Sequence, residues 1–325
     1  MKVCIVGAGA IGSFLGTRLA AAGVQTSALA RGATLAALRQ HGWRMETAQG
    51  PVTAPVRASD SATQLGAQDL VVIAVKAPAL SAAAATLGPL LGPDTLVLPA
   101  MNGVPWWFCR GRPGFEAPLE SADPGGAIGR AIDAERVVGC VVHVSASAPE
   151  PGRVAHKMGQ GLIVGEPGGG RSARVQRVAD LLAGAGLEVT HSADVRRDLW
   201  YKLWGNLTMN PVSAITGATI DRVLADAQVR AFCSAAMAEA AAVGARIGCA
   251  IEQSPEDRHA ITAKLGAFKT SMLQDVEAGR AIELDAIVGA VHEIAQRVGV
   301  DTPHIGALLG LTRLFAQQRG LYPLS

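Results

Sequence analysis

A short apolar run at the start of the chain ends in a glycine-rich turn, and this feature constrains the fold more than any other. The run Val3–Val6 is typical of a buried strand, and an amphipathic segment reaching Ala22 follows the turn. Strand, tight turn and helix in this order allow a backbone to approach a dinucleotide pyrophosphate and to point free N–H groups at it. The alternative is an ordinary glycine-rich turn. We expect a dinucleotide to bind the turn, which consists of Gly7, Ala8, Gly9, Ala10, Ile11 and Gly12.

The end of the next expected strand indicates which dinucleotide this is. An NAD site usually has an acidic residue there to hold the ribose hydroxyls. Residues 25–29 form the expected strand, and Ala30-Arg31 follow it without an acid. A guanidinium at this place is suited to pair with a 2′-phosphate, although Arg31 could also be a solvated loop arginine. The sequence therefore favours NADP(H) as the cofactor.

The pattern of apolar segments divides the chain into two parts. Strands are expected at 69–75, 95–98, 137–144 and 162–164, with helices at 35–41, 78–91 and 172–185. This alternation predicts an α/β domain, a doubly wound Rossmann-type sheet of six or more strands over residues 1–193. Residues 194–325 predict an all-helical domain, with helices at 195–210, 229–248, 255–276, 285–299 and 305–318.

Composition excludes several classes of function. A net charge of +2, from 29 basic and 27 acidic residues mixed along the chain, offers no basic stripe for nucleic acid. The 5 cysteines form no CxxC pair, which favours a reducing compartment and a cytoplasmic location. No apolar stretch has the ~20 residues of a membrane span. The 7 histidines are scattered without ligand spacing, so no metal site is expected.

Further segments, taken together with the turn, give the chain a family resemblance. They are Val75-Lys76, Met101-Asn102-Gly103-Val104, Lys202-Leu203-Trp204-Gly205-Asn206 with Asn210-Pro211, and Ser271-Met272-Leu273-Gln274-Asp275 followed by Glu283. In order and spacing these segments, which cover nearly the whole chain, resemble the ketopantoate reductases. The resemblance implies NADPH-dependent reduction of 2-dehydropantoate to pantoate, a step of pantothenate biosynthesis.

One expected helix has a polar face whose residue types indicate a catalytic role without reference to the family. Lys202, Asn206 and Asn210 are spaced by four residues, so a helix presents an ammonium and two amides along one side. Hydride delivery to a ketone builds negative charge on its oxygen, and a lysine whose pKa is lowered by burial can protonate it. We therefore expect Lys202 to be the general acid and both asparagines to bind substrate. The alternatives are an exposed helix lysine and asparagines that bond to the local backbone.

Two polar residues follow the carboxyl ends of expected strands. Lys76 and Asn102 hold these positions, where ligands bind in open α/β sheets. Both are expected beside the nicotinamide half of the cofactor, and Asn102 also beside the substrate. A solvated lysine and an ordinary Asn-Gly turn are the alternatives.

The resemblance implies three further site residues. It places Ser271 at the substrate carboxylate, Glu283 at the reacting hydroxyl or the nicotinamide, and Ser145 near the cofactor. From the sequence alone, Glu283 could equally be an acid in the first turn of a helix.

The chain departs from the family pattern at two places. An aromatic cluster, Trp106-Trp107-Phe108, follows Asn102-Gly103 and suggests an exposed lid, a subunit contact or packing between the domains. Ile220 stands where many family members have an asparagine, so a polar substrate contact is missing. The substrate could therefore be a different branched or aromatic 2-oxo acid, and a noncatalytic NADP(H)-binding sensor is the alternative of another class. The alanine- and glycine-rich helices leave room for a homodimer.

Overall fold

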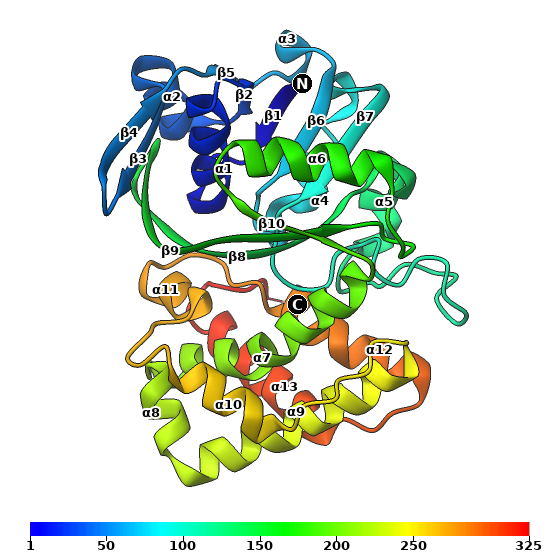
Figure 1. Cartoon of the computed structure of the whole chain (residues 1–325). Helices are drawn as coiled ribbons and strands as arrows, with labels where there is room; N and C mark the ends of the chain where they lie inside the picture. Colours follow the sequence, from blue (N-terminus) through cyan, green and yellow to red (C-terminus); the bar gives the residue numbers. More distant parts are fainter. Residues whose placement is uncertain (325) are drawn as a thin grey trace. The chain divides into compact units, whose positions relative to one another are not determined.

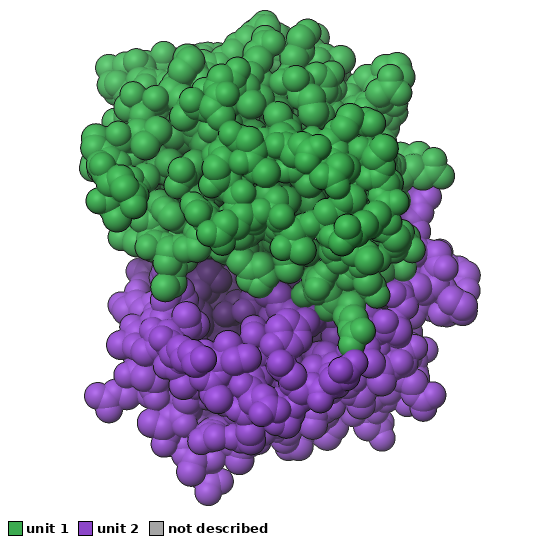
Figure 2. Space-filling model, viewed as in Figure 1, with its two compact units in different colours: residues 1–101, 127–198 green, residues 102–126, 199–325 purple. Residues whose placement is uncertain are grey.

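The structure is a computed structural model that describes residues 1–324. The chain forms two compact units (Figure 2). Unit 1 comprises residues 1–101 and 127–198, and unit 2 comprises residues 102–126 and those from Leu199 onward. None of the helices described over residues 1–324 is long and apolar enough to cross a membrane.

A five-stranded parallel sheet forms one part of unit 1 (Figure 1). Its strands lie in the order β5-β2-β1-β6-β7. The chain runs from β1 to one side of the sheet and later returns to the other side, so the strand order reverses between β1 and β6. Ligands bind at such a switch point, beyond the carboxyl ends of the strands. The bounds are β1 (Lys2–Val6), β2 (Gln25–Leu29), β5 (Arg57–Ser59), β6 (Gln68–Ile73) and β7 (Leu91–Pro99).

A second sheet completes unit 1. It has the order β10-β9-β3-β4, and β8 pairs with the other edge of β9 in an antiparallel hairpin. The bounds are β3 (Trp43–Thr47), β4 (Gly50–Ala54), β8 (Gly139–Glu150), β9 (Arg153–Gly165) and β10 (Glu188–Ser192).

Helix α1 (Ala10–Ala21) lies between the two sheets (Figure 1). It is apolar on almost every side because it is enclosed by both, and Phe14, Leu15 and Leu19 are fully buried. A Cβ on Gly16 would lie 2.4 Å from Cζ2 of Trp43, so this glycine admits the indole of β3. Trp43 in turn donates its indole N–H to Thr26 Oγ1 in β2 at 3.1 Å.

The other helices of unit 1 are mostly short. They are α2 (Gly32–His41), α3 (Ala62–Leu65), η1 (Ala77–Ala79), α4 (Leu80–Ala84), η2 (Gly88–Leu90), α5 (Ala127–Ala131), η4 (Ala134–Arg136) and α6 (Ala173–Gly184).

Unit 2 is helical. After the short η3 (Pro124–Gly126), it contains most of α7 (Val195–Thr216), α8 (Ile220–Ala225), α9 (Ala227–Arg246), α10 (Pro255–Ala263), α11 (Ser271–Glu277), the π-helical turn η5 (Asp285–Gly289), α12 (Ala290–Val298) and α13 (Pro303–Gln317). An α/β half with a parallel sheet and an all-helical half are the fold class predicted from the sequence, which is thus confirmed.

The strand predictions for 137–144 and 162–164 were right in kind and wrong in place. Residues 139–144 and 162–164 belong to β8 and β9 of the second sheet, and Val137 makes only an isolated bridge to Val97 of β7, so the parallel sheet has five strands instead of six or more. The hairpin β3–β4 was not predicted at all. Its partner in the sheet is β9, about a hundred residues away, with Arg44 opposite Arg153.

Several expected helices are interrupted where the chain carries a breaking residue. The one expected over 78–91 is divided into η1, α4 and η2, and Pro89 lies in η2, just before β7. The one expected over 255–276 ends at Ala263, and α11 begins only after Thr270, whose hydroxyl caps it by accepting from Leu273 N at 3.1 Å. Conversely, α7 continues through Pro211 to Thr216.

The aromatic segment after Asn102 is buried, which rules out the exposed lid among the alternatives that the sequence left open. Trp107 and Phe108 are 1% and 0% exposed, and Phe108 stacks on Trp200 with ring centroids 5.9 Å apart. Both residues lie in unit 2, because residues 102–126 pack with the helices although they were assigned to the first domain by sequence.

Candidate active site

The glycine-rich turn in unit 1 has little room for side chains. Gly7 has a φ of +92°, and a Cβ there would lie 2.6 Å from Val75 Cγ1. A Cβ on Gly12 would lie 2.0 Å from the carbonyl oxygen of Gly7. By contrast, a Cβ on Gly9 would meet nothing within 4 Å. The turn is therefore packed tightly on its own backbone and on the end of β6, but it is open at Gly9.

The amino end of α1 is suited to bind an anion. Gly9 is its N-cap, no side chain caps it, and its first turn contains no acidic residue. The free N–H groups and the helix dipole of such an end attract phosphate. Ala8, Ala10 and Ile11 are not fully buried, so this backbone is partly accessible. The residues present fit a dinucleotide pyrophosphate.

Arg31 follows β2 as the N-cap of α2. It is exposed, and its guanidinium makes no hydrogen bond or ion pair within residues 1–324. No acid occupies the end of β2, where Leu29-Ala30 precede it. This end of the strand thus offers an unopposed positive charge.

Lys76 and Ser145 occupy different surroundings in unit 1. Lys76 is partly buried and follows Val75, the residue on which Gly7 packs. Ser145 lies in β8 of the second sheet, partly buried, opposite Met158 at a shift in the strand register. Helix α1 packs against this strand, so the serine belongs to the layer beneath the helix.

The polar face of α7 in unit 2 is joined to Asn102. The Lys202 ammonium donates to Asn102 Oδ1 at 2.7 Å, in partly buried surroundings. The bond connects residues one hundred positions apart and fixes the direction of the lysine side chain. It brings together two residues that the sequence analysis singled out separately.

The two asparagines of the same face have amide groups available for a ligand. Asn210 is 5% exposed, and its Nδ2 is buried without a hydrogen-bond acceptor. Asn206, one turn earlier, is partly buried, and its amide makes no hydrogen bond within residues 1–324. A buried amide N–H without a partner costs about 1–3 kcal/mol, so an acceptor from a ligand is the simplest reason for its place.

The Asn102–Gly103 turn is docked on the π-helical turn η5. Val104 N donates to the carbonyl oxygen of Ala286 at 2.7 Å. Gly103 has a φ of +83°, and a Cβ there would lie 2.6 Å from the same oxygen. π-Helical turns are often found at functional sites. This contact places Asn102 next to the segment that begins with Glu283.

Glu283 and Ser271 differ in their burial. Glu283 is 9% exposed and lies just before the helical segment that contains η5. Ser271 is exposed as the first residue of α11, and its hydroxyl makes no hydrogen bond within residues 1–324. Of the two residues, only Glu283 is held near Asn102 by a described contact, which runs through Ala286.

A hydrogen-bonded pair beside this segment, Tyr322 and Asp285, was not predicted from the sequence. Tyr322 donates its hydroxyl to Asp285 Oδ1 at 2.8 Å. Burial raises the pKa of Asp285 above its usual range, while the bond from Tyr322 opposes this. Burial and the nearby carboxylate raise the pKa of Tyr322 to about 12. The contact joins residues 37 positions apart, so no local sequence pattern indicates it.

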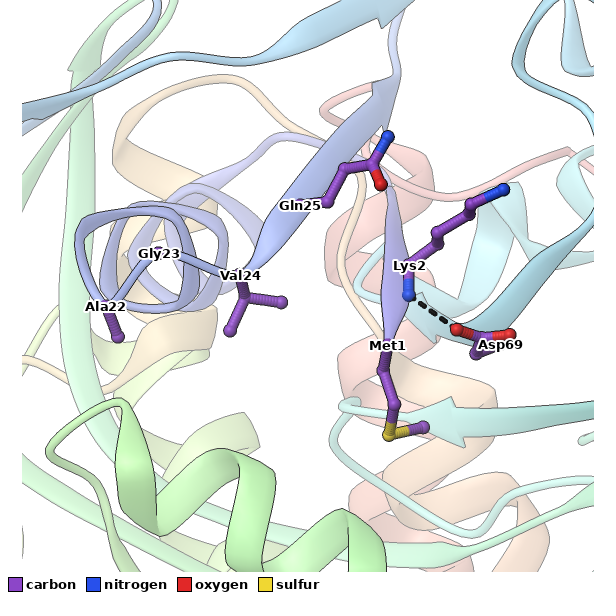
Figure 3. Close-up of a pocket in the computed structure, with 7 residues that line it drawn as sticks. All are labelled: Met1, Lys2, Ala22, Gly23, Val24, Gln25 and Asp69. Atoms are coloured by element: carbon purple, nitrogen blue, oxygen red, sulfur yellow. Dashed lines mark hydrogen bonds between the residues drawn. The ribbon is translucent and has the colours of Figure 1, made fainter.

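Other features of the described chain do not add to this site. A pocket of about 530 Å³ lies at the amino ends of β1 and β2, where Lys2 N donates to Asp69 Oδ2 at 2.6 Å (Figure 3). The glycine turn follows the carboxyl end of β1, so this pocket lies at the opposite ends of the strands. Within residues 1–324, no group of three or more His, Cys, Asp or Glu side chains could hold a metal ion.

Comparisons with known proteins agree over nearly the whole chain. Residues 3–169 match the family described as ketopantoate reductase PanE/ApbA, and residues 194–316 match its C-terminal part. The 2-dehydropantoate 2-reductase of Mesorhizobium japonicum is 44% identical, over 99% of this chain and 100% of that protein.

Solved structures share the fold. A protein from Ralstonia solanacearum MolK2, provisionally described as a ketopantoate reductase, is 55% identical with a TM-score of 0.94, over 98% of this chain and 99% of that one. A D-mandelate dehydrogenase in complex with NADH and anilino(oxo)acetate has a TM-score of 0.84 over 98% of this chain and 100% of that one. At 22% identity, that second similarity concerns the fold alone.

Proposed function

This chain belongs to the ketopantoate reductase family, and we propose that it reduces the keto group of a small 2-oxo acid with NADPH, with 2-dehydropantoate as the first substrate to test. The product is the corresponding 2-hydroxy acid. The observation that carries the proposal is the Lys202–Asn102 hydrogen bond on the helix face where the Asn210 amide is buried without an acceptor.

The residues of unit 1 are suited to hold the cofactor. Gly7–Gly12 and the amino end of α1 would bind the pyrophosphate, and Arg31 the 2′-phosphate. Lys76 and Ser145, with Asn102 and Glu283 of unit 2, would contact the nicotinamide half. When bound, NADPH supplies the hydride that reduces the ketone carbon.

The residues of unit 2 would handle the substrate and the proton. Lys202 gives a proton to the ketone oxygen as negative charge develops on that oxygen, and Asn102 orients the ammonium by accepting a hydrogen bond from it. Asn206 and Asn210 donate to oxygen atoms of the substrate. Ser271 binds the carboxylate, and Glu283 binds the reacting hydroxyl.

Oxidation of NADPH, followed at 340 nm with the purified protein, tests the proposal. Saturable oxidation with 2-dehydropantoate is the expected result, and a panel of aliphatic and aromatic 2-oxo acids identifies any better substrate. Ile220 is 2% exposed in an apolar cluster with Met209 and Val223, so it offers the substrate no polar contact. Preference for a less polar acid would follow from this. Tight NADPH binding without turnover of any acid would instead favour a sensor.

Arg31→Ala is expected to raise the KM for NADPH roughly 10-fold while leaving the KM for NADH unchanged, because an exposed charge-assisted contact to the 2′-phosphate is lost. Steady-state kinetics with both cofactors would measure this. Arg171→Ala, which removes an exposed arginine elsewhere in unit 1, is the control. An equal change for NADPH and NADH would contradict a role in recognising the 2′-phosphate.

We also propose that the enzyme is cytoplasmic, since all five cysteines, which lie within residues 1–324, are buried and none is in a disulfide. Burial raises the pKa of Cys4 and that of Cys233 to about 11, which keeps both thiols protonated and unreactive. A homodimer stays a prediction.

A further inference from the structure

An arginine of α10 lies against the helix that carries the polar face. The guanidinium carbon of Arg258 is 4.8 Å from the ring centroid of Tyr201, and its Nη1 lies 3.5 Å from the Tyr201 hydroxyl oxygen. A Cβ on Gly205 would lie 2.9 Å from Arg258 Nε and 3.0 Å from Nη2. The guanidinium is thus in contact with α7 at the residue between Trp204 and Asn206.

The charge of Arg258 is not matched by a carboxylate. Within residues 1–324 it forms no ion pair, and its Nε is shielded from solvent without an acceptor. The two acids of α10 are engaged elsewhere: Glu256 accepts from Arg230 and Ser234, and Asp257 accepts from Ser254. Apart from the weak bond from Nη1 to the Tyr201 hydroxyl, the guanidinium therefore has N–H donors left for an anion, and the shielded Nε–H has lost its hydrogen bond to water.

The position of Gly205 relates this charge to the candidate active site. Residues three or four apart on a helix are neighbours, so Gly205 lies beside Lys202 on the surface of α7. Any larger residue at 205 would push the guanidinium away from the helix. A glycine costs about 1 kcal/mol relative to alanine in a helix interior, and here the space it leaves is filled by the arginine.

We propose that Arg258 binds a carboxylate of the substrate, next to the ketone that Lys202 protonates. A guanidinium pairs with a carboxylate through two parallel hydrogen bonds, which fixes the orientation of a planar 2-oxo acid. The face of Tyr201 holds the arginine in place before the substrate arrives. This inference rests on the proposed function, and it adds a specificity residue to the set inferred from the family.

The alternative is a purely structural contact in which Arg258 only connects α10 to α7 through the ring of Tyr201. Such a contact predicts a loss of thermal stability in variants of Arg258 and no change in KM. Binding of a carboxylate predicts a higher KM with little loss of thermal stability, so experiment can distinguish the two roles.

Arg258→Ala is expected to raise the KM for the 2-oxo acid roughly 10- to 100-fold with little change in kcat or in NADPH affinity. Arg258→Lys should recover part of this loss, because it keeps the charge without the planar pair of donors. Gly205→Ala should raise the KM as well, while the thermal midpoint stays or rises. Arg246→Ala, at an exposed arginine of α9, is the matched control and should leave the KM unchanged.

Two nonreducible ligands show which carboxylate is bound. Oxamate has one carboxylate next to its carbonyl, and N-oxalylglycine has a second at its far end. Calorimetry on the NADP⁺ complex should show that Arg258→Ala weakens both ligands equally if the arginine holds the carboxylate beside the ketone. Weakening of N-oxalylglycine alone would show that the arginine holds a distal carboxylate and would overturn its assignment to the carboxylate beside the ketone.

The two proposals can fail separately. Absence of turnover in the wild type, with ligand binding that depends on Arg258, would overturn the reductase but leave this carboxylate site. Turnover in the wild type, with the same KM and the same ligand affinities in Arg258→Ala, would overturn the carboxylate site alone. A wild-type protein that binds neither oxamate nor N-oxalylglycine would overturn it too.

Discussion

Replacing Lys202 with alanine is expected to lower kcat by roughly 10²- to 10⁴-fold, the usual loss when a general acid is removed. The ammonium is the only group on the polar face of α7 that can deliver a proton, since its neighbours there are amides. NADPH affinity should persist, because the glycine turn and Arg31 are in the other unit. Stopped-flow measurement of hydride transfer, with NADPH binding followed by fluorescence, would test both parts.

Two further variants make this test specific. Lys202→Arg keeps a positive charge but cannot release a proton at accessible pH, so it should remain as slow as the alanine variant. Lys264→Ala removes an exposed lysine from the end of α10 and should have no effect. Turnover at the wild-type rate in Lys202→Ala would reject Lys202 as the acid.

Gly9→Ala is expected to weaken NADPH binding roughly 100-fold, about the effect of losing two charge-assisted hydrogen bonds to a phosphate. A Cβ at this position meets no protein atom within 4 Å, and Gly9 has a φ of −80°, which alanine adopts freely. The variant should therefore fold normally, with its methyl group in the space that the pyrophosphate would use. Titration of NADPH, alongside thermal unfolding, measures the two effects separately.

Gly12→Ala is the informative comparison for this variant. Its Cβ would lie 2.0 Å from the Gly7 carbonyl oxygen, so the turn itself must shift and stability should fall together with affinity. If Gly9→Ala bound NADPH as well as the wild type, the turn would not be the pyrophosphate site.

The sequence predicted those elements whose pattern lies within a few neighbouring residues, and it failed where an element depends on distant parts of the chain. The turn, α1 and the helical second half follow from residues close together in the chain. The hairpin β3–β4 was missed although Trp43 and Met45 alternate with the polar Arg44 and Glu46, which is a strand pattern of only five residues. Its place in the sheet could not be predicted, because it depends on the distant pairing of Met45 with Val154 in β9.

The candidate site shows the same limit. The spacing of Lys202, Asn206 and Asn210 correctly placed them on one helix, α7. That Lys202 would bond to Asn102 could not be read from spacing, since it depends on the packing of residues 102–126 with the helices of unit 2. For the same reason, the sequence left open whether the aromatic residues of that segment form an exposed lid, a subunit contact or packing between the domains. In the structure they are buried, and Phe108 stacks on Trp200.

The enclosure of α1 between two sheets has a consequence for how this protein tolerates change. On the side of α1 that faces the second sheet, the Trp43 indole packs into the space beside Gly16. A helix braced on both sides cannot tilt, so its amino end is preorganised and loses little entropy when an anion arrives. An insertion at the exposed hairpin tip, at Gln49, should leave the amino end of α1 in place, whereas loss of the Trp43 indole should loosen the helix from one side.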